Sequence, residues 1–209
     1  MNALIIGASG GIGSALASQL KGKYELFLVG RDASKLKTVS DKSGGQAIPT
    51  DVSSELEVQA LFEDLPNLDL VVYSAGDIQP EPLKIASNDH WQRIMDANLT
   101  GLFYTLKHVD AKLNKQSRIY VLGARPELVT YRSFGAYAAA KAGVAQLVKV
   151  AAIEMKRKAS LTLVLPRAVN TSFWANVGEP PSDALSPADV ANAISQNLEQ
   201  DPSAELKVD

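Results

Sequence analysis

Two side chains four residues apart, Tyr137 and Lys141, could act together as a proton donor and a nearby cation. Residues at positions i and i+4 face the same side of a helix, so the two groups would lie close together. An ammonium group beside a phenol favours the phenolate, so we expect Lys141 to lower the pKa of Tyr137 from its usual value of about 10. A Tyr–Lys pair at this spacing is common by chance, and it predicts acid–base chemistry only in combination with other features.

A glycine cluster near the N-terminus supplies such a feature. Four of the 14 glycines lie between Gly7 and Gly13, directly after the apolar run Ala3–Ile6. Where a strand turns into a helix, free N–H groups and the helix dipole bind phosphate, and glycines let the backbone approach a pyrophosphate closely. The spacing departs from the strict G-x-G-x-x-G fingerprint, and the absence of Lys before Lys21 excludes a Walker loop. The alternative is a glycine-rich turn without a ligand. We predict a dinucleotide site that includes Gly7, Ser9, Gly10, Gly11, Ile12 and Gly13.

Composition excludes several other kinds of protein. The chain has no Cys, which excludes a disulfide scaffold, thiolate metal sites and a cysteine nucleophile. His90 and His108 show no metal-ligand spacing, so no metal site is predicted. The 21 basic and 23 acidic residues give a net charge of −2, which offers no basic surface for nucleic acid. The apolar run Ala3–Ile6 is too short for a signal or membrane segment, so we expect a cytoplasmic protein with no membrane partner.

The elements that must position these residues alternate between strands and helices. Mostly apolar runs such as Leu68–Tyr73 are typical of strands buried on both faces of a parallel sheet. A helix start is expected where Ser186 precedes Pro187, with Asp189 three residues after the serine. We predict a single α/β domain over residues 1–209, a doubly wound, three-layer Rossmann-type fold with a seven-stranded parallel sheet. The predicted strands are Ala3–Ile6, Glu25–Val29, Ala47–Ile48, Leu68–Tyr73, Arg118–Leu122, Leu161–Leu165 and Glu205–Val208, and the predicted helices are 12–21, 33–42, 54–64, 88–114, 134–158 and 187–199.

This combination resembles the short-chain dehydrogenase/reductase family, and the resemblance covers nearly the whole chain. The glycine cluster matches the family's G-x-x-x-G-x-G turn, and Tyr137 with Lys141 matches its Y-x-x-x-K pair. The segment WQRIMDANLTG (91–101) matches the segment that carries the family's catalytic Asn, here Asn98. The resemblance implies that Tyr137 is the acid/base, that Lys141 holds the cofactor ribose, and that Asn98 helps to hold a water linking Lys141 to solvent.

Three further matches follow predicted strands and concern the cofactor. Asp51 and Val52 match the pair whose aspartate meets the adenine, and Thr171 lies at the position that binds the nicotinamide amide. Ala75 and Gly76 match the end of the family's Asn-Asn-Ala-Gly, whose two Asn positions are occupied here by Tyr73 and Ser74. The resemblance therefore implies that Asp51, Val52, Ala75, Gly76 and Thr171 line the cofactor site.

One departure from the family affects catalysis directly. The family places a Ser thirteen residues before its catalytic Tyr, and here that position is Ala124. Losing one donor to the substrate oxygen costs on the order of 10²–10³ in rate. Ser133 and Thr130 lie in the same loop and could substitute. Arg125 and Arg132 bring positive charge there, either as solvated charge or as a site for an anionic substrate.

The choice of cofactor depends on the end of the second predicted strand. An NAD enzyme usually carries an acid there for the ribose hydroxyls. That position is Gly30, followed by Arg31, whose guanidinium would pair with a 2′-phosphate, and Lys35 could assist. Asp32 would become the ribose acid after a shift of two residues. We favour NADP over NAD.

The predicted function is an NADP-dependent oxidoreductase that transfers hydride between the nicotinamide and a small carbonyl or alcohol substrate. The alternative, motivated by Ala124, is a non-catalytic dinucleotide-binding redox sensor or regulatory protein. A sugar-nucleotide epimerase is disfavoured because about 20 residues (166–186) precede the last predicted helix, too few for a substrate subdomain. Phe173 and Trp174 could form part of a lid or pack in the core. The resemblance implies a homo-dimer or homo-tetramer, in which the helix that holds Tyr137 and Lys141 packs against its copy.

Overall fold

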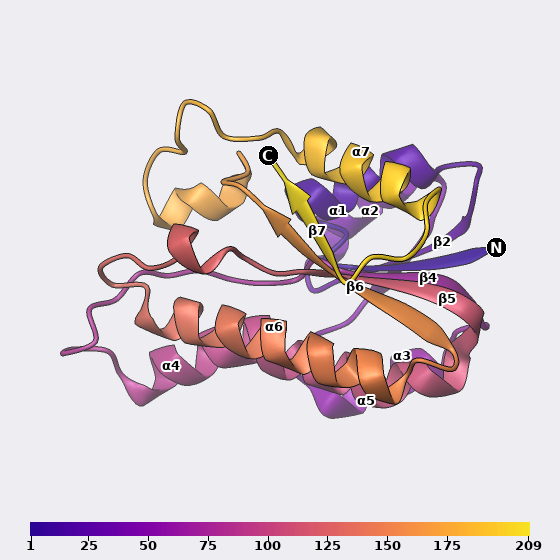
Figure 1. The fold of residues 1–209 in the computed structure, drawn as a ribbon, viewed down its shortest axis with the longest axis horizontal. Coiled ribbons are helices and arrows are strands. Elements are labelled where there is room, and N and C mark those ends of the chain that lie inside the picture. The colour runs from indigo at the N-terminus through magenta and orange to yellow at the C-terminus, as the bar shows by residue number, and fades with distance from the viewer.

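A computed structural model describes all residues of the chain, Met1–Asp209. Seven strands form one parallel sheet in the order β3-β2-β1-β4-β5-β6-β7. The chain steps outward from β1 to β3, crosses back to β4 beside β1, and steps outward again to β7 (Figure 1). The strands are β1 (Asn2–Ile6), β2 (Glu25–Gly30), β3 (Gln46–Pro49), β4 (Leu68–Tyr73), β5 (Leu113–Leu122), β6 (Ala159–Pro166) and β7 (Glu205–Val208).

Helices cover both faces of this sheet, which gives the three layers visible in Figure 1. One face carries α1 (Gly11–Leu20), α2 (Ala33–Ser43) and α7 (Pro187–Leu198). The other carries α3 (Glu55–Asp64), α5 (Gly101–Val109) and α6 (Gly135–Glu154), with α4 (Asn88–Met95) against α6. The predicted capping of the last helix is confirmed, because the Ser186 and Asp189 side chains each bond the other residue's backbone N–H. Short helical turns complete the chain: η1 (Asp96–Thr100, π-helical) and the 3₁₀ turns η2 (Asp110–Lys112), η3 (Pro126–Leu128) and η4 (Ser172–Asn176).

Alternate residues along a strand belong to two separate cores, one on each face of the sheet. On β1, Leu4 and Ile6 belong to a cluster of 26 buried residues under α3, α5 and α6. Their neighbours Ala3 and Ile5 belong to a cluster of 19 buried residues under α1, α2 and α7. Because successive side chains of a strand point to opposite faces, a strand covered on both faces is apolar at nearly every position. The predicted doubly wound sheet is therefore confirmed.

Two predicted helices differ from the structure. The segment 88–114 is not one helix: the π turn η1 separates α4 from α5, and residues 113–114 already belong to β5. The segment 134–158 forms helix only to Glu154. α6 is long and apolar enough to pass a length-and-composition test for a membrane span. Its buried residues Ala140, Val144, Val148 and Ala151, however, face the sheet, as expected of a core helix.

Candidate active site

A cleft of about 1190 Å³ lies at the carboxyl ends of the central strands. It opens where the strand order reverses between β1 and β4, the usual ligand position in an open parallel sheet. Of the three predicted catalytic residues, Asn98 alone does not line it, and lies behind Gly76. The predicted residues along the cleft are Gly7, Ser9, Gly10, Gly11, Ile12, Gly13, Arg31, Asp51, Val52, Ala75, Gly76, Tyr137, Lys141 and Thr171.

The glycine turn joins β1 to α1 in a space that admits no larger residue. Gly7 has φ +83°, and a Cβ there would lie 2.6 Å from the backbone nitrogen of Ala75 on the neighbouring strand end. A Cβ on Gly11 would lie 2.8 Å from the Thr171 Cγ2. The turn therefore packs directly against the loops after β4 and β6, which brings three predicted cofactor segments together.

The first turn of α1 presents its backbone N–H groups to the cleft. Its N-cap residue Gly10 makes no side-chain capping bond, and the turn contains no acidic residue. In contrast, α2, α3, α4 and α7 each begin with a side-chain oxygen that accepts a backbone N–H. Uncapped N–H groups at the positive end of a helix dipole bind phosphate. The turn therefore fits the pyrophosphate of a dinucleotide.

The strand end after β2 bears on the cofactor's ribose. A Cβ on Gly30 would lie 2.9 Å from the Ser9 Oγ, so the glycine turn occupies the space of an acid at this position. Asp32 caps α2 by accepting the Lys35 N–H at 3.0 Å, and that bond holds the pKa of Asp32 below its usual value. The Lys35 ammonium lies 3.7 Å from the same carboxylate and does not line the cleft, so the structure does not bring it to the cofactor end as expected. Arg31 lines the cleft and makes no ion pair within the chain.

Strands β3 and β4 contribute the opposite wall. The Asp51 Oδ1 accepts the backbone N–H and the hydroxyl of Ser53 at 3.0 and 2.7 Å, which fixes the carboxylate at the cleft. Ser74 replaces one Asn of the family motif and donates its hydroxyl to the Ile6 carbonyl at 2.8 Å, tying β4 to β1. The other replacement, Tyr73, is buried in the core. Both departures are therefore accommodated within the sheet and leave the cleft open.

Tyr137 and Lys141 lie one helical turn apart on α6, as their spacing predicts. The Lys141 ammonium lies 5.6 Å from the centre of the Tyr137 ring and donates to the Leu122 carbonyl at 3.1 Å. The expected lowering of the Tyr137 pKa is wrong in this structure, because burial raises it. Burial also lowers the pKa of Lys141 to about 8. Shielding from water disfavours both charged forms, and the ammonium is directed at a carbonyl rather than at the phenol oxygen.

Asn98 lies in the π turn η1, between α4 and α5. Its amide nitrogen donates to the carbonyls of Asp77 and Ile94 at 2.7 and 2.9 Å, while its Oδ1 is buried without a hydrogen-bond partner. That oxygen faces Gly76, where a Cβ would lie 2.8 Å away. Single π turns are frequent at functional sites, and a buried, unpartnered acceptor is uncommon. The position fits a role in holding a water at the rear of the cleft.

The loop between β5 and α6 contains no replacement for the missing serine. Ala124 lines the cleft, but neither Ser133 nor Thr130 does. The Thr130 hydroxyl donates to the Pro126 carbonyl at 2.6 Å. Arg125 lines the cleft and is not solvated charge, because its guanidinium donates to the carbonyls of Leu165 and Val208 and to the Asp209 side chain. Arg132 lies exposed at the cleft rim.

Aromatic side chains form a part of the site that sequence reasoning partly missed. Phe173 and Trp174, in η4, line the cleft and are half-buried, which fits a lid. Phe134 also lines the cleft, directly before α6, and was not predicted. Its position three residues before Tyr137 was the available signal, since such residues share a helix face.

Comparisons with known proteins agree with this geometry. The family model described as short chain dehydrogenase matches residues 1–182. An uncharacterised oxidoreductase of Staphylococcus aureus is 28% identical over 209 residues, covering 95% of this chain and 90% of the relative. A solved protein from Thermus thermophilus, assigned as a short-chain oxidoreductase, is 36% identical with a TM-score of 0.90, covering 97% of this chain and 98% of that one. A serine dehydrogenase solved with NADP⁺ shares the fold, with a TM-score of 0.89 at 22% identity, covering 100% of this chain and 94% of that one.

The family match therefore rests on the whole arrangement of the chain. The glycine turn, the strand order and the Tyr–Lys pair on α6 occur together in one cleft. The chain belongs to the short-chain dehydrogenase family of oxidoreductases, with a Rossmann-type α/β fold.

Proposed function

We propose that the protein is an NADP-dependent oxidoreductase that interconverts small carbonyl compounds and alcohols. The observation that carries the proposal is the placement of Tyr137 in the same cleft as the uncapped start of α1 and the unpaired Arg31. A bound nicotinamide dinucleotide supplies the hydride. Gly10–Gly13 would hold its pyrophosphate, Asp51 its adenine end, and Thr171 its amide end.

Tyr137 is the proposed acid in carbonyl reduction. Because burial raises its pKa, the phenol stays protonated at neutral pH and holds the proton that the substrate oxygen needs. As the carbonyl carbon gains hydride, its oxygen takes that proton from the Tyr137 hydroxyl. Lys141, with a pKa of about 8, is still mostly cationic at neutral pH and stabilises the phenolate that remains. In alcohol oxidation both transfers run in reverse.

The preference for NADP rests on Arg31. A guanidinium pairs with a phosphate through two parallel hydrogen bonds, and Arg31 has no carboxylate partner within the chain. The nearby acid, Asp32, already serves as the cap of α2. Related folds solved with NADP, the serine dehydrogenase and a short-chain dehydrogenase of Burkholderia cenocepacia, support the same preference.

Thermal unfolding with NADP⁺ and with NAD⁺ tests the cofactor assignment. A ligand present at 100 times its Kd stabilises the folded state by about 2.7 kcal/mol, which gives a measurable rise in Tm. We expect NADP⁺ to raise the Tm more than NAD⁺ does, and Arg31→Ala to remove the difference. A larger shift with NAD⁺ would contradict the role of Arg31, and no shift with either would contradict the whole cofactor site.

Oxidation of NADPH with a panel of aldehydes and ketones tests the activity. With at least one carbonyl compound, wild type should oxidise NADPH roughly 10²-fold or more faster than Tyr137→Phe, since general acid catalysis contributes that much. If both proteins bind NADPH and oxidise it at the same background rate, the oxidoreductase proposal fails. The non-catalytic dinucleotide sensor would then replace it.

A further inference from the structure

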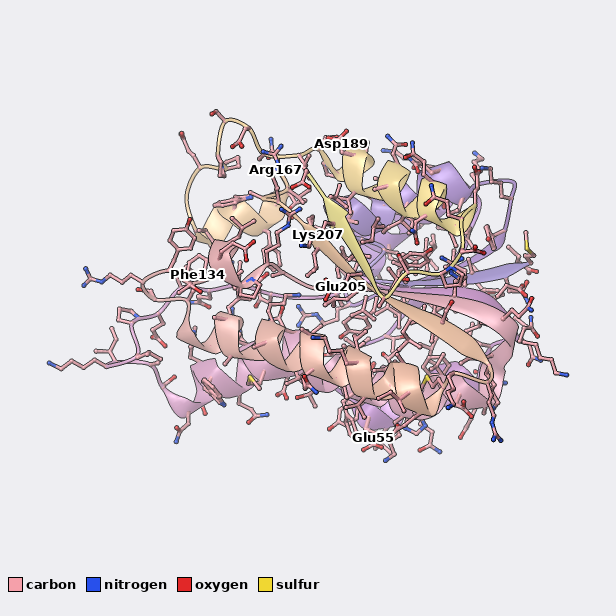
Figure 2. All side chains as sticks on the ribbon, viewed as in Figure 1. Glu55, Phe134, Arg167, Asp189, Glu205 and Lys207 are labelled. Carbon is pink, nitrogen blue, oxygen red and sulfur yellow. The ribbon has the colours of Figure 1, made fainter.

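An aromatic cluster surrounds Tyr137 at the substrate end of the cleft. We define it as Tyr131, Phe134, Tyr137 and Phe173, all of which line the cleft. Phe134, labelled in Figure 2 near the start of α6, stands edge-on to Tyr137, with ring centres 6.2 Å apart and planes at 87°. Phe173 lies 6.0 Å from Tyr137 on the opposite segment η4, and Tyr131 lies 5.9 Å from Phe134. A substrate whose carbonyl reaches the Tyr137 hydroxyl therefore contacts these rings.

Three of the polar side chains that line the cleft near this cluster bond within the protein. The Trp174 Nε1 donates to a backbone carbonyl at 2.9 Å, and the Arg167 Nη1 donates to the carboxylate of Asp183 at 2.6 Å. Arg125 is bound to two carbonyls and a carboxylate, as described above. Ala124 adds a methyl group where the family carries a hydroxyl. The bonds of these three polar side chains occupy donors that a substrate with many hydroxyl groups would need in place of water, whereas the buried Arg167 Nε has no partner.

We propose that the cleft selects aromatic carbonyl compounds, in which an aldehyde or ketone is attached to a six-membered aromatic ring with few other polar groups. The inference rests on the proposed function and specifies its substrate class. Phe134 and Phe173 are the specificity-determining residues: the substrate ring packs against them while its carbonyl oxygen accepts from Tyr137. In the reduction, hydride adds to the carbonyl carbon, the Tyr137 proton goes to the oxygen, and the nicotinamide is oxidised as the aryl alcohol forms.

Aromatic rings contact each other more favourably than a saturated ring of the same size does, because the edge of one ring attracts the face of the other. Benzaldehyde and cyclohexanecarbaldehyde differ in this property while sharing shape and reacting group. The two substrates therefore separate aromatic recognition from simple filling of space. Glyceraldehyde, a polyhydroxylated aldehyde, tests whether the substrate end tolerates unpaired hydroxyls.

The experiment measures kcat/KM with NADPH for these three aldehydes in wild type, Phe134→Leu and Phe173→Leu. Phe103→Leu is the matched control, since Phe103 is 47% exposed on α5 and lies outside the cleft. We expect each cleft variant to lower the value for benzaldehyde about three- to tenfold and to leave cyclohexanecarbaldehyde within about twofold. Glyceraldehyde should be the poorest substrate of wild type. Equal losses for the two ring aldehydes, or efficient turnover of glyceraldehyde, would overturn the inference.

Binding separates this inference from the proposed function. Calorimetric titration of the NADPH-saturated protein with benzyl alcohol and with cyclohexylmethanol involves no turnover, because neither partner can accept the hydride. We expect tighter binding of benzyl alcohol in wild type and in Phe103→Leu, and loss of that preference in the two cleft variants. If no aldehyde is reduced above the Tyr137→Phe rate, the proposed function fails, and the titration alone decides aromatic selection. Equal binding of the two alcohols to wild type would contradict it.

Discussion

Lys141 is a cation held inside the protein by its place on α6. Its side chain is buried, and the ammonium has one protein acceptor, the Leu122 carbonyl. A charge in such a position lowers the free energy of unfolding, whereas a charge on the surface does not. This buried cation lies where the phenol of Tyr137 needs a positive charge nearby. Such a trade is typical of catalytic sites.

Replacing Lys141 with Met should therefore stabilise the ligand-free protein at neutral pH. The lysine pKa falls from 10.5 to about 8 on folding, so the folded state binds fewer protons than the unfolded state between these values. The contribution of Lys141 to the free energy of unfolding is least favourable below pH 8 and becomes more favourable as the pH increases toward 10.5. Lys141→Met should raise the free energy of unfolding by about 2 kcal/mol at pH 7, after allowance for the lost hydrogen bond.

Urea denaturation of wild type and Lys141→Met at pH 7 and pH 9.5 measures this effect. The gain should shrink at the higher pH, because wild-type Lys141 is then mostly neutral. Tyr137 does not disturb the comparison in this range, since burial raises its pKa and both states keep the phenol largely protonated. A constant difference between the two proteins at both pH values would contradict the buried-cation explanation.

Ala124 offers a test in the opposite direction, toward gain of activity. Restoring a hydroxyl with Ala124→Ser would add a donor at the cleft beside the substrate oxygen. One such donor is worth on the order of 10²–10³ in rate in an optimised site, and we expect at least roughly tenfold here. The gain should appear in kcat rather than in the Kd for NADPH. An unchanged or lower kcat would show that the carbonyl oxygen lies away from residue 124.

At the scale of elements, the loop between β5 and α6 is held by the far end of the chain. Arg125 donates to the Leu165 carbonyl on β6 and to the Val208 carbonyl on β7, and it pairs with Asp209 at 2.7 Å. The same pairing holds the pKa of Asp209 below its usual value, so the pair is lost as the pH falls. The loop that begins beside Ala124 is therefore anchored across three strands.

Arg125→Ala should release this loop and lower stability. Two backbone carbonyls lose a charged donor, which costs about 2 kcal/mol in the free energy of unfolding. The KM for the carbonyl substrate should rise while the Kd for NADPH stays unchanged, because the glycine turn lies on other strands. Arg132→Ala, in the same loop but exposed, is the control for stability. Equal effects of the two substitutions on unfolding would contradict an anchoring role for Arg125.

For the molecule as a whole, large apolar side chains remain exposed on α6. Val150 is 41% exposed and Ile153 70%. In a monomer these groups would contact water, although large contiguous apolar patches are rarely exposed on monomeric soluble proteins. The predicted homo-oligomer, in which α6 packs against its copy, would cover them. Self-association stays a prediction.

Light scattering coupled to gel filtration tests the predicted self-association. Wild type should elute at two or four times the chain mass, and Ile153→Lys should shift the population toward single chains by placing a charge in the packed face. Lys149→Ala, at a nearby exposed position of the same helix, serves as a control that should keep the wild-type mass. A wild-type protein that elutes as a single chain at all concentrations would exclude the predicted dimer and tetramer.

Features that depend on a local pattern of residues could be predicted from the amino-acid sequence. The predicted bounds of strand Leu68–Tyr73 match the observed ones, because a strand covered on both faces is apolar at nearly every position, here all but Asp69. The glycine turn and the Tyr137–Lys141 pair were likewise readable, since their geometry follows from a strand–helix junction and from helical spacing. The break in the segment 88–114 was not readable, because a π turn follows from how Asn98 packs against the loop after β4.

Features that depend on distant partners or on burial became clear only from the folded structure. The pKa direction of Tyr137 follows from its loss of contact with water, which spacing along a helix does not reveal. Arg125 finds Asp209 across 84 residues of chain, so its loop position alone suggested charge directed at solvent or substrate. The aromatic cluster joins Phe134 to Phe173 around Tyr137 only because β5 and β6 are neighbours in the sheet. Folding sets these distances, and they determine what the side chains named by the sequence can do.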